Sequence, residues 1–219
     1  MDILLFGIQG SGKGTQAKAL SLALNFPIFE AGAELRKMAV QDTPTGNEIR
    51  KIISKGNLVP PGLLLLKVMD FLEHPASHSG IIFDGIPRAM EQAESFDEVM
   101  KTKHRDNLAI AIDLSENAAI ERLLKRRICT TCGTAFMPDY SNDMCNHCGG
   151  ILIHRADDTT EAIQTRFGKY KAETLPVIEH YQKQGKLIVV DGNQAIIDVT
   201  KDIFNQLSPQ MKLRKQQNL

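Results

Sequence analysis

The chain has 219 residues, and its 26 lysines and arginines are balanced by 26 aspartates and glutamates, so the formal net charge at pH 7 is zero. This balance argues against a general affinity for nucleic acid or membranes, and any anion site must come from local clusters of arginine. No apolar run approaches the length of a membrane span, and the N-terminal residues lack a signal-peptide pattern. We expect one α/β domain with insertions, in a cytoplasmic, monomeric protein without a nucleic-acid or membrane partner.

The first predicted element is a strand over Ile3–Phe6, followed by the glycine-rich stretch Gly7–Thr15 and a helix over Gln16–Leu24. The four glycines of the stretch let the backbone curve around an anion at the positive end of the helix dipole. Lys13 is placed to reach the outer phosphates of a nucleotide, and the Thr15 hydroxyl to face Mg²⁺. A flexible turn that contains a lysine by chance would not explain the strand before it and the helix after it. The stretch therefore predicts a phosphate-binding loop.

The next part of the chain is polar, helical and thin in core residues. We predict a short strand over 26–29, a helix from Glu30 that ends at the breaker Thr43–Gly46, a helix over 47–55, and a helix from Pro61 to Phe71. We interpret the region from about 30 to 60 as an insertion on the main sheet.

The remaining strands are short apolar runs that alternate with helices. Predicted strands cover 80–85, 108–113 and 187–192; predicted helices cover the segment up to Lys101, the segment from the cap Ser115 to Arg127, 161–184 with an interruption at Pro176, and 196–207 before a fraying tail. This alternation predicts an α/β fold with a parallel sheet of about five strands and helices on both faces.

Asp84 ends one of the buried strands, in the sequence Phe83-Asp84-Gly85. At the carboxyl end of a strand beside the loop, its carboxylate can hold Mg²⁺ through water. The alternative is an ordinary Asp-Gly turn.

The four cysteines form two Cys-x-x-Cys pairs, Cys129 with Cys132 and Cys145 with Cys148. In a cytosolic chain this spacing predicts a tetrahedral zinc site rather than disulfides. Four thiolates can also hold iron, and the sequence does not decide between the two metals.

Six arginines lie beside the predicted loops and insertions: Arg36, Arg88, Arg122, Arg126, Arg155 and Arg166. Phosphoryl transfer requires such groups, because charge spreads over the oxygens of the transferred group. Spacing alone does not select these six, since single arginines are usually solvated surface residues.

The chain resembles the adenylate kinases, and more broadly the nucleoside monophosphate kinases. The matching motifs occur in the family's order over nearly the whole chain: Gly7-x-x-Gly10-x-Gly12-Lys13-Gly14-Thr15, Asp84-Gly85-x-Pro87-Arg88 with Gln92, Arg122-x-x-x-Arg126-Arg127, Arg155-x-Asp157-Asp158 with Arg166, and Val190-Asp191-Gly192. The resemblance implies a core of residues 1–29, 60–126 and 161–219. It also implies a monophosphate-binding insertion at 30–59 and a zinc-binding lid at 127–160.

The resemblance also implies roles for individual residues in the reaction MgATP + AMP ⇌ 2 ADP. The ATP phosphates would be held by the loop residues Gly10, Ser11, Gly12, Lys13, Gly14 and Thr15 together with Arg122 and Arg126. AMP would contact Ala31, Gly32, Arg36, Val59, Gly85, Arg88, Gln92, Arg155 and Arg166. The catalytic residues would be Lys13, Arg88, Arg122, Arg126, Arg155 and Arg166. Asp84 would position hydrated Mg²⁺, and Asp157 and Asp158 would anchor the closed lid.

Three departures from the family pattern affect these implications. Gln9 replaces the usual proline of the loop, and Glu30-Ala31-Gly32-Ala33 replaces Ser-Thr-Gly-Asp. Ala31 lacks the hydroxyl that faces the acceptor base, as in the UMP/CMP kinases, whereas Gln92 and the long lid are adenylate-type. UMP, CMP or another monophosphate therefore remains an alternative acceptor.

A different class of function would make the cysteine segment a zinc ribbon that binds nucleic acid or protein, with the loop as a nucleotide sensor. A nucleic-acid module should carry a basic stripe or exposed aromatic residues. Residues 129–150 contain no Lys or Arg. This composition favours a zinc ion that holds the lid together.

Overall fold

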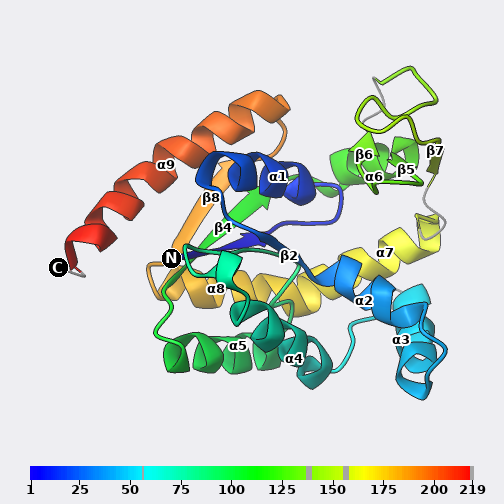
Figure 1. The fold of residues 1–219 in the computed structure, drawn as a ribbon. Coiled ribbons are helices and arrows are strands. Elements are labelled where there is room, and N and C mark those ends of the chain that lie inside the picture. Colours follow the sequence, from blue (N-terminus) through cyan, green and yellow to red (C-terminus); the bar gives the residue numbers. More distant parts are fainter. Residues whose placement is uncertain (56, 137–139, 155–157, 218–219) are drawn as a thin grey trace.

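The computed structural model describes residues 1–217 except 56, 137–139 and 155–157, and describes side chains up to residue 209. Its centre is a five-stranded sheet in the order β2-β3-β1-β4-β8, and every neighbouring pair is parallel (Figure 1). The strands are β1 (Asp2–Phe6), β2 (Ile28–Glu30), β3 (Ile82–Asp84), β4 (Asn107–Asp113) and β8 (Leu187–Asp191). The predicted α/β class with a five-stranded parallel sheet is confirmed.

Helices cover both faces of this sheet because its central strands are apolar on both sides. Along β1, Ile3 and Leu5 pack on one face, and Leu4 and Phe6 on the other. The first face is covered by α1 (Lys13–Leu24) and α9 (Ile196–Gln217). The second is covered by α4 (Pro61–Leu72), α5 (Met90–Thr102) and α8 (Leu175–Lys183).

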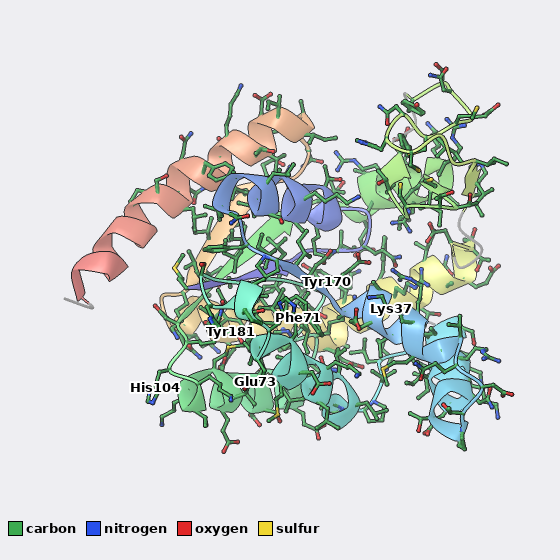
Figure 2. The ribbon with its side chains drawn as sticks, in the orientation of Figure 1. Lys37, Phe71, Glu73, His104, Tyr170 and Tyr181 are labelled. Atoms are coloured by element: carbon green, nitrogen blue, oxygen red, sulfur yellow. The ribbon has the colours of Figure 1, made fainter. Side chains whose placement is uncertain are left out.

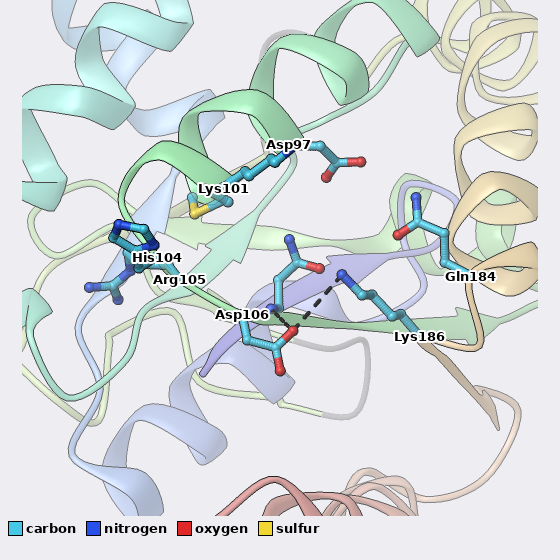
Figure 3. A pocket seen from close by; sticks show the side chains of 9 residues that line it. Asp97, Lys101, His104, Arg105, Asp106, Gln184 and Lys186 are labelled. Atoms are coloured by element: carbon cyan, nitrogen blue, oxygen red, sulfur yellow. Dashed lines mark hydrogen bonds and ion pairs between the residues drawn. The ribbon is translucent and has the colours of Figure 1, made fainter. Parts of the chain in front are cut away.

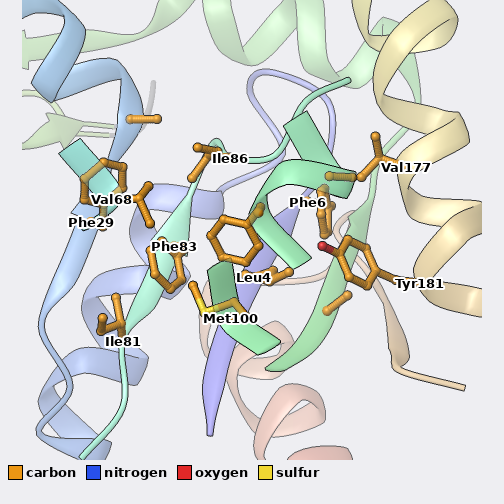
Figure 4. Close-up of a cluster of buried hydrophobic side chains, with 14 of the residues drawn as sticks. Leu4, Phe6, Phe29, Val68, Ile81, Phe83, Ile86, Met100, Val177 and Tyr181 are labelled. Atoms are coloured by element: carbon orange, nitrogen blue, oxygen red, sulfur yellow. The ribbon is translucent and has the colours of Figure 1, made fainter. Parts of the chain in front are cut away.

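The second face holds most of the aromatic residues of the core (Figure 4). The ring of Phe83 lies 5.0 Å from that of Phe96 and 5.8 Å from that of Phe29, between centroids. Tyr181 packs against Phe6 at 5.7 Å and donates its hydroxyl to Asp97 Oδ1 at 2.8 Å. These contacts fix the strands whose carboxyl ends form the candidate site.

The helical insertion, which we define as residues 31–59, contains α2 (Ala31–Ala39) and α3 (Pro44–Ser54). Its own small core consists of the buried residues Ala39, Ile49 and Val59. The prediction that Thr43–Gly46 breaks the chain and that the next helix begins at Asn47 was wrong. Thr43 is the N-cap, its Oγ1 accepts from Gly46 N at 3.0 Å, and Pro44 occupies the first helical position.

The cysteine segment, residues 127–154, forms a separate antiparallel sheet in the order β6-β5-β7. Its strands are β5 (Arg127–Cys129), β6 (Ala135–Phe136) and β7 (Leu152–His154). The preceding helix, α6 (Glu116–Lys125), ends before Arg127, where we had predicted its end, because Arg127 pairs in β5.

Two further helices differ from prediction. The interruption expected at Pro176 is a π-helical turn, Tyr170–Thr174, between α7 (Thr160–Lys169) and α8, in which Pro176 lies within the first turn of α8. The last helix does not end at 207 but continues to Gln217. None of the helices in the described part of the chain has the length and apolar composition that a membrane span requires.

Candidate functional site

The glycine-rich loop joins β1 to α1 at the carboxyl edge of the sheet. Gly10 adopts φ +90°, and a Cβ on it would lie 3.0 Å from the carbonyl oxygen of Ala119 in α6, so a larger residue does not fit here. Ser11 is buried, and its hydroxyl has no hydrogen-bond partner among the described residues. A buried hydroxyl of this kind fits a loop whose polar atoms are completed by a bound ligand.

Lys13 is the first residue of α1, and its ammonium group turns back into the loop. Nζ donates to the carbonyl oxygens of Gly7 at 2.7 Å and Ile8 at 3.1 Å. Burial of the ammonium group lowers the pKa of Lys13 to about 8, an effect that the nearby Asp84 opposes and that Arg88 and Arg126 reinforce. Lys13 is therefore mostly protonated at neutral pH, although burial disfavours its charged form.

Asp84 ends β3 directly beside the start of α1. Its Oδ2 lies 3.6 Å from the position that a Cβ on Gly14 would occupy. Burial raises the pKa of the Asp84 carboxyl, and Glu30 raises it further, whereas Lys13, Arg88 and Arg36 act in the opposite direction. Because burial disfavours the ionised carboxylate, a nearby cation would stabilise it. Asp84 therefore fits a place beside a hydrated divalent cation that is bound together with phosphate.

Arg88 is positioned by three hydrogen bonds to its backbone and side chain. Its N–H donates to Gln92 Oε1 at 2.8 Å, its Nε donates to Gly85 O at 2.9 Å, and its carbonyl accepts from Thr174 Oγ1 at 2.9 Å. Gly85 has φ +84°, and a Cβ on it would lie 2.6 Å from an Arg88 guanidinium nitrogen. The guanidinium therefore lies directly over a position that only glycine can occupy.

Arg36, on α2, belongs to the same edge of the sheet. Its Nη2 donates to Glu30 Oε1 at 2.9 Å, and it lies close enough to Asp84 to influence the pKa of that carboxyl. Lys13, Asp84, Arg88 and Arg36 thus come together at the carboxyl ends of β1, β2 and β3. This is the arrangement expected where parallel strands end.

A second group of arginines lies on α6 (Arg122), at the residue directly after it (Arg126) and on α7 (Arg166). Arg126 donates from Nη2 and Nε to Asp158 Oδ2 at 2.6 and 3.0 Å, and Arg166 donates to Asp158 Oδ1 at 3.4 Å. The Arg126 guanidinium lies near enough to Lys13 for its charge to contribute to the lowered pKa of that ammonium group. Arg122 Nη2 donates to Gly192 O at 2.9 Å, next to the end of β8. Arg155 and Asp157 lie outside the described residues.

The four cysteine sulfurs converge within 4.8 Å of one another, and they are the one cluster of potential metal ligands found in the described part of the chain. The Sγ atoms of Cys129 and Cys148 are 3.5 Å apart, and those of Cys132 and Cys145 are 3.7 Å apart. A zinc ion about 2.3 Å from each sulfur in tetrahedral geometry requires sulfurs about 3.8 Å apart. The backbone N–H groups of Cys132 and Thr131 point at the Cys129 sulfur and lower the pKa of its thiol. The residues present therefore fit a Cys₄ zinc site.

Two predicted acceptor residues have buried side chains. Ala31 packs in the core beneath the sheet, and Val59 packs in the core of the helical insertion. Gly32 lies beside Arg36, since a Cβ on it would be 3.1 Å from Nη1. Any contact that Ala31 or Val59 makes with a ligand would therefore involve its backbone.

Sequence reasoning missed Thr174 as a residue of this site. Its hydroxyl holds the Arg88 carbonyl from a π-helical turn 86 residues further along the chain. A threonine before Leu-Pro carries no local signal of such a contact. Glu30 was noted only as a departure from the family pattern.

A surface hollow of about 560 Å³ lies at the opposite end of the sheet (Figure 3). Asp106 and Asn107 at the start of β4 and Lys186 before β8 line it, and Lys186 Nζ lies 3.9 Å from Asp106 Oδ1. The hollow is thus separate from the loop and the arginines.

Comparison with known proteins identifies the family to which the chain is similar. The family model for adenylate kinase matches residues 5–186. The adenylate kinase of Methanocella arvoryzae is 41% identical over 209 residues, which cover 93% of this chain and 96% of that protein. The adenylate kinase of Kosmotoga olearia is 38% identical over 94% of this chain and 99% of its own length, and that of Clostridium botulinum is 37% identical over 96% and 100%.

Proposed function

This chain belongs to the adenylate kinase family, and we propose that it catalyses the reversible transfer MgATP + AMP ⇌ 2 ADP. The observation that carries this proposal is the convergence of Lys13, Asp84 and Arg88 at one edge of the sheet, directly beside the glycine-rich loop. Such a site suits phosphoryl transfer, because positioning and charge stabilisation supply most of the catalysis.

The loop and Lys13 would bind the donor. Lys13 donates to the carbonyls of Gly7 and Ile8, and it would exchange these hydrogen bonds for phosphate oxygens of ATP. The N–H groups of Gly10–Thr15 at the start of α1 would surround the same phosphates. Asp84 would hold hydrated Mg²⁺, which when bound neutralises charge on the phosphate oxygens.

The arginines would hold the acceptor phosphate and the transferred group. Arg36 and Arg88 would hold the phosphate of AMP, in line with the donor phosphate, so that no covalent enzyme intermediate is needed. Arg122, Arg126 and Arg166, together with Arg155, would surround the group in transfer. Asp158, which bridges Arg126 and Arg166, supports this role because it keeps both guanidinium groups together.

The cysteine segment would act as a lid over the donor, and its four cysteines would hold a structural zinc ion. Closure would exclude water and suppress hydrolysis of ATP. The metal would stabilise the segment without acting as an electrophile, since four thiolates leave no open position.

Gln92 supports an adenine acceptor. Because its Oε1 accepts from the Arg88 N–H, its Nε2 is left to donate to a ring nitrogen such as N1 of adenine. Cytosine N3 is an acceptor as well, and Ala31 lacks a hydroxyl. A UMP/CMP kinase is therefore the second candidate.

The deciding experiment is phosphoryl transfer from MgATP to AMP, UMP, CMP, GMP and dAMP, assayed separately under one condition. We expect the highest kcat/KM for AMP. A preference for a pyrimidine nucleotide would identify a UMP/CMP kinase and would make Ala31 the informative residue. Transfer to none of the five would favour a nucleotide-sensing protein.

We further propose a monomer without nucleic-acid or membrane partners in a reducing, cytoplasmic compartment. The arrangement of the four cysteines as a metal site supports this compartment, because thiolate ligands must stay reduced.

A further inference from the structure

Glu30 lies at the edge of the candidate site and contacts one of its arginines. It ends β2, where it pairs in register with Asp84 of β3, and its Oε1 accepts from Arg36 Nη2 at 2.9 Å. Glu30 is also the N-cap residue of α2, but its side chain makes no capping hydrogen bond there. The carboxylate therefore contacts the guanidinium and not the helix end.

The pair is accessible to a ligand. The side chains of Arg36 and Glu30 are 46% and 51% exposed, and the guanidinium lies over Gly32, where a Cβ would be 3.1 Å from Nη1. An exposed ion pair of this kind is weak, because water and salt screen it. A phosphate that carries more charge can therefore displace the carboxylate.

Acidic and basic side chains lie close together at this edge of the sheet. Glu30 raises the pKa of the Asp84 carboxyl, so its negative charge reaches the centre of the site, whereas Lys13, Arg88 and Arg36 act in the opposite direction. The negative charge of Glu30 therefore repels an incoming phosphate. The phosphate must also replace Glu30 as the partner of the Arg36 guanidinium.

We propose that Glu30 is a positioning residue that competes with the acceptor phosphate for Arg36 and thereby raises the KM for the acceptor. The inference rests on the proposed function, in which Arg36 binds the phosphate of AMP. Glu30 acts before the phosphate is bound, so its removal changes acceptor affinity more than the rate of the chemical step.

The test compares Glu30→Gln with Glu34→Gln. Glu34 lies on the same helix and accepts from Lys37 Nζ at 2.6 Å (Lys37 is labelled in Figure 2), so this variant removes an ion pair of α2 that does not involve Arg36. At saturating MgATP, Glu30→Gln should lower the KM for AMP by roughly two- to five-fold, the range expected for an exposed ion pair. The difference should shrink as salt is raised, and Glu34→Gln should leave KM unchanged. An unchanged or raised KM in Glu30→Gln would overturn the proposal.

Arg36→Gln separates this proposal from the function on which it rests. It should raise the KM for AMP, and Glu30→Gln added to it should change KM less than it does in the wild-type protein. If Arg36→Gln raises KM but Glu30→Gln does not lower it, the competition is refuted and the function stands. If Arg36→Gln leaves KM unchanged, Arg36 is not an acceptor ligand and both statements about it fail.

Discussion

The helical insertion and the cysteine segment both project from the same parallel sheet, but their interiors differ in kind. The insertion buries Ala39, Ile49 and Val59 and relies on apolar contacts and a helix cap. The cysteine segment buries Phe136 and Leu152 together with two of its four cysteines. Neither cluster could support an independent domain, because so few side chains bury little apolar surface. Two small segments thus have different interiors: the helical insertion is built on apolar side-chain packing, and the cysteine segment is built around four convergent sulfurs.

Removal of the proposed zinc ion should give the largest effect, and it should destabilise the cysteine segment only. We expect a chelator, or Cys145→Ser, to unfold the cysteine segment, because a structural zinc site contributes its binding free energy to folding. Hydrogen exchange should rise over residues 127–154 and stay unchanged over 31–59. Phosphoryl transfer should fall at least tenfold, since closure of the proposed lid would be lost. Equal exchange in the metal-free and metal-loaded protein would contradict this account.

Ile49→Ala should produce the opposite pattern. Ile49 is fully buried in the insertion, so the cavity should lower the free energy of unfolding by about 2–5 kcal/mol. This destabilisation should be confined to α2 and α3. Exchange should rise over 31–59, and the KM for AMP should rise with it. Bound zinc, measured by a chromophoric chelator after denaturation, should stay at one ion per chain; loss of zinc would mean that the two regions are coupled.

Thr43→Ala should give the smallest effect of the three. The Thr43 side chain accepts from Gly46 N at the start of α3, and its loss should cost about 1 kcal/mol. Thr159→Ala is the matched control, because Thr159 caps α7 in the same way through Ala162 N at 3.2 Å. Local exchange should rise in α3 for the first variant and in α7 for the second. The same pattern in both would show that the insertion does not unfold independently.

The parallel sheet and the phosphate-binding loop were predictable from sequence, because each is encoded locally. Short apolar runs flanked by glycines and helices identify the strands, and the spacing of glycines around Lys13 identifies the loop. The cysteine spacing predicted, for the same reason, that the four sulfurs come together. These signals need no knowledge of distant contacts.

The rest depends on distant contacts, which sequence reasoning could not see. Thr174 reaches Arg88 only because α8 packs beneath the sheet, and Glu30 meets Arg36 only because the chain turns sharply from β2 into α2. The boundary errors have local causes. Thr43-Pro44 was interpreted as a breaker although it is a helix start, and the polar composition after Ser208 concealed the continuation of α9.

The π-helical turn Tyr170–Thr174 determines how this part of the chain should respond to the deletion of a single residue. Phe167 in α7 packs against α6, whereas Val177 in α8 packs beneath the sheet, and the turn accommodates one more residue between them than an α-helix would. Deletion of one residue from the turn would therefore leave a regular α-helix in which α7 and α8 keep their relative orientation, so Val177 and Tyr181 would stay in the core. Deletion of one residue within α8 would instead rotate every later side chain by about 100°. A single-codon deletion at the exposed Lys171 should therefore be tolerated better than one at the exposed Glu179, which would move Tyr181 out of the core.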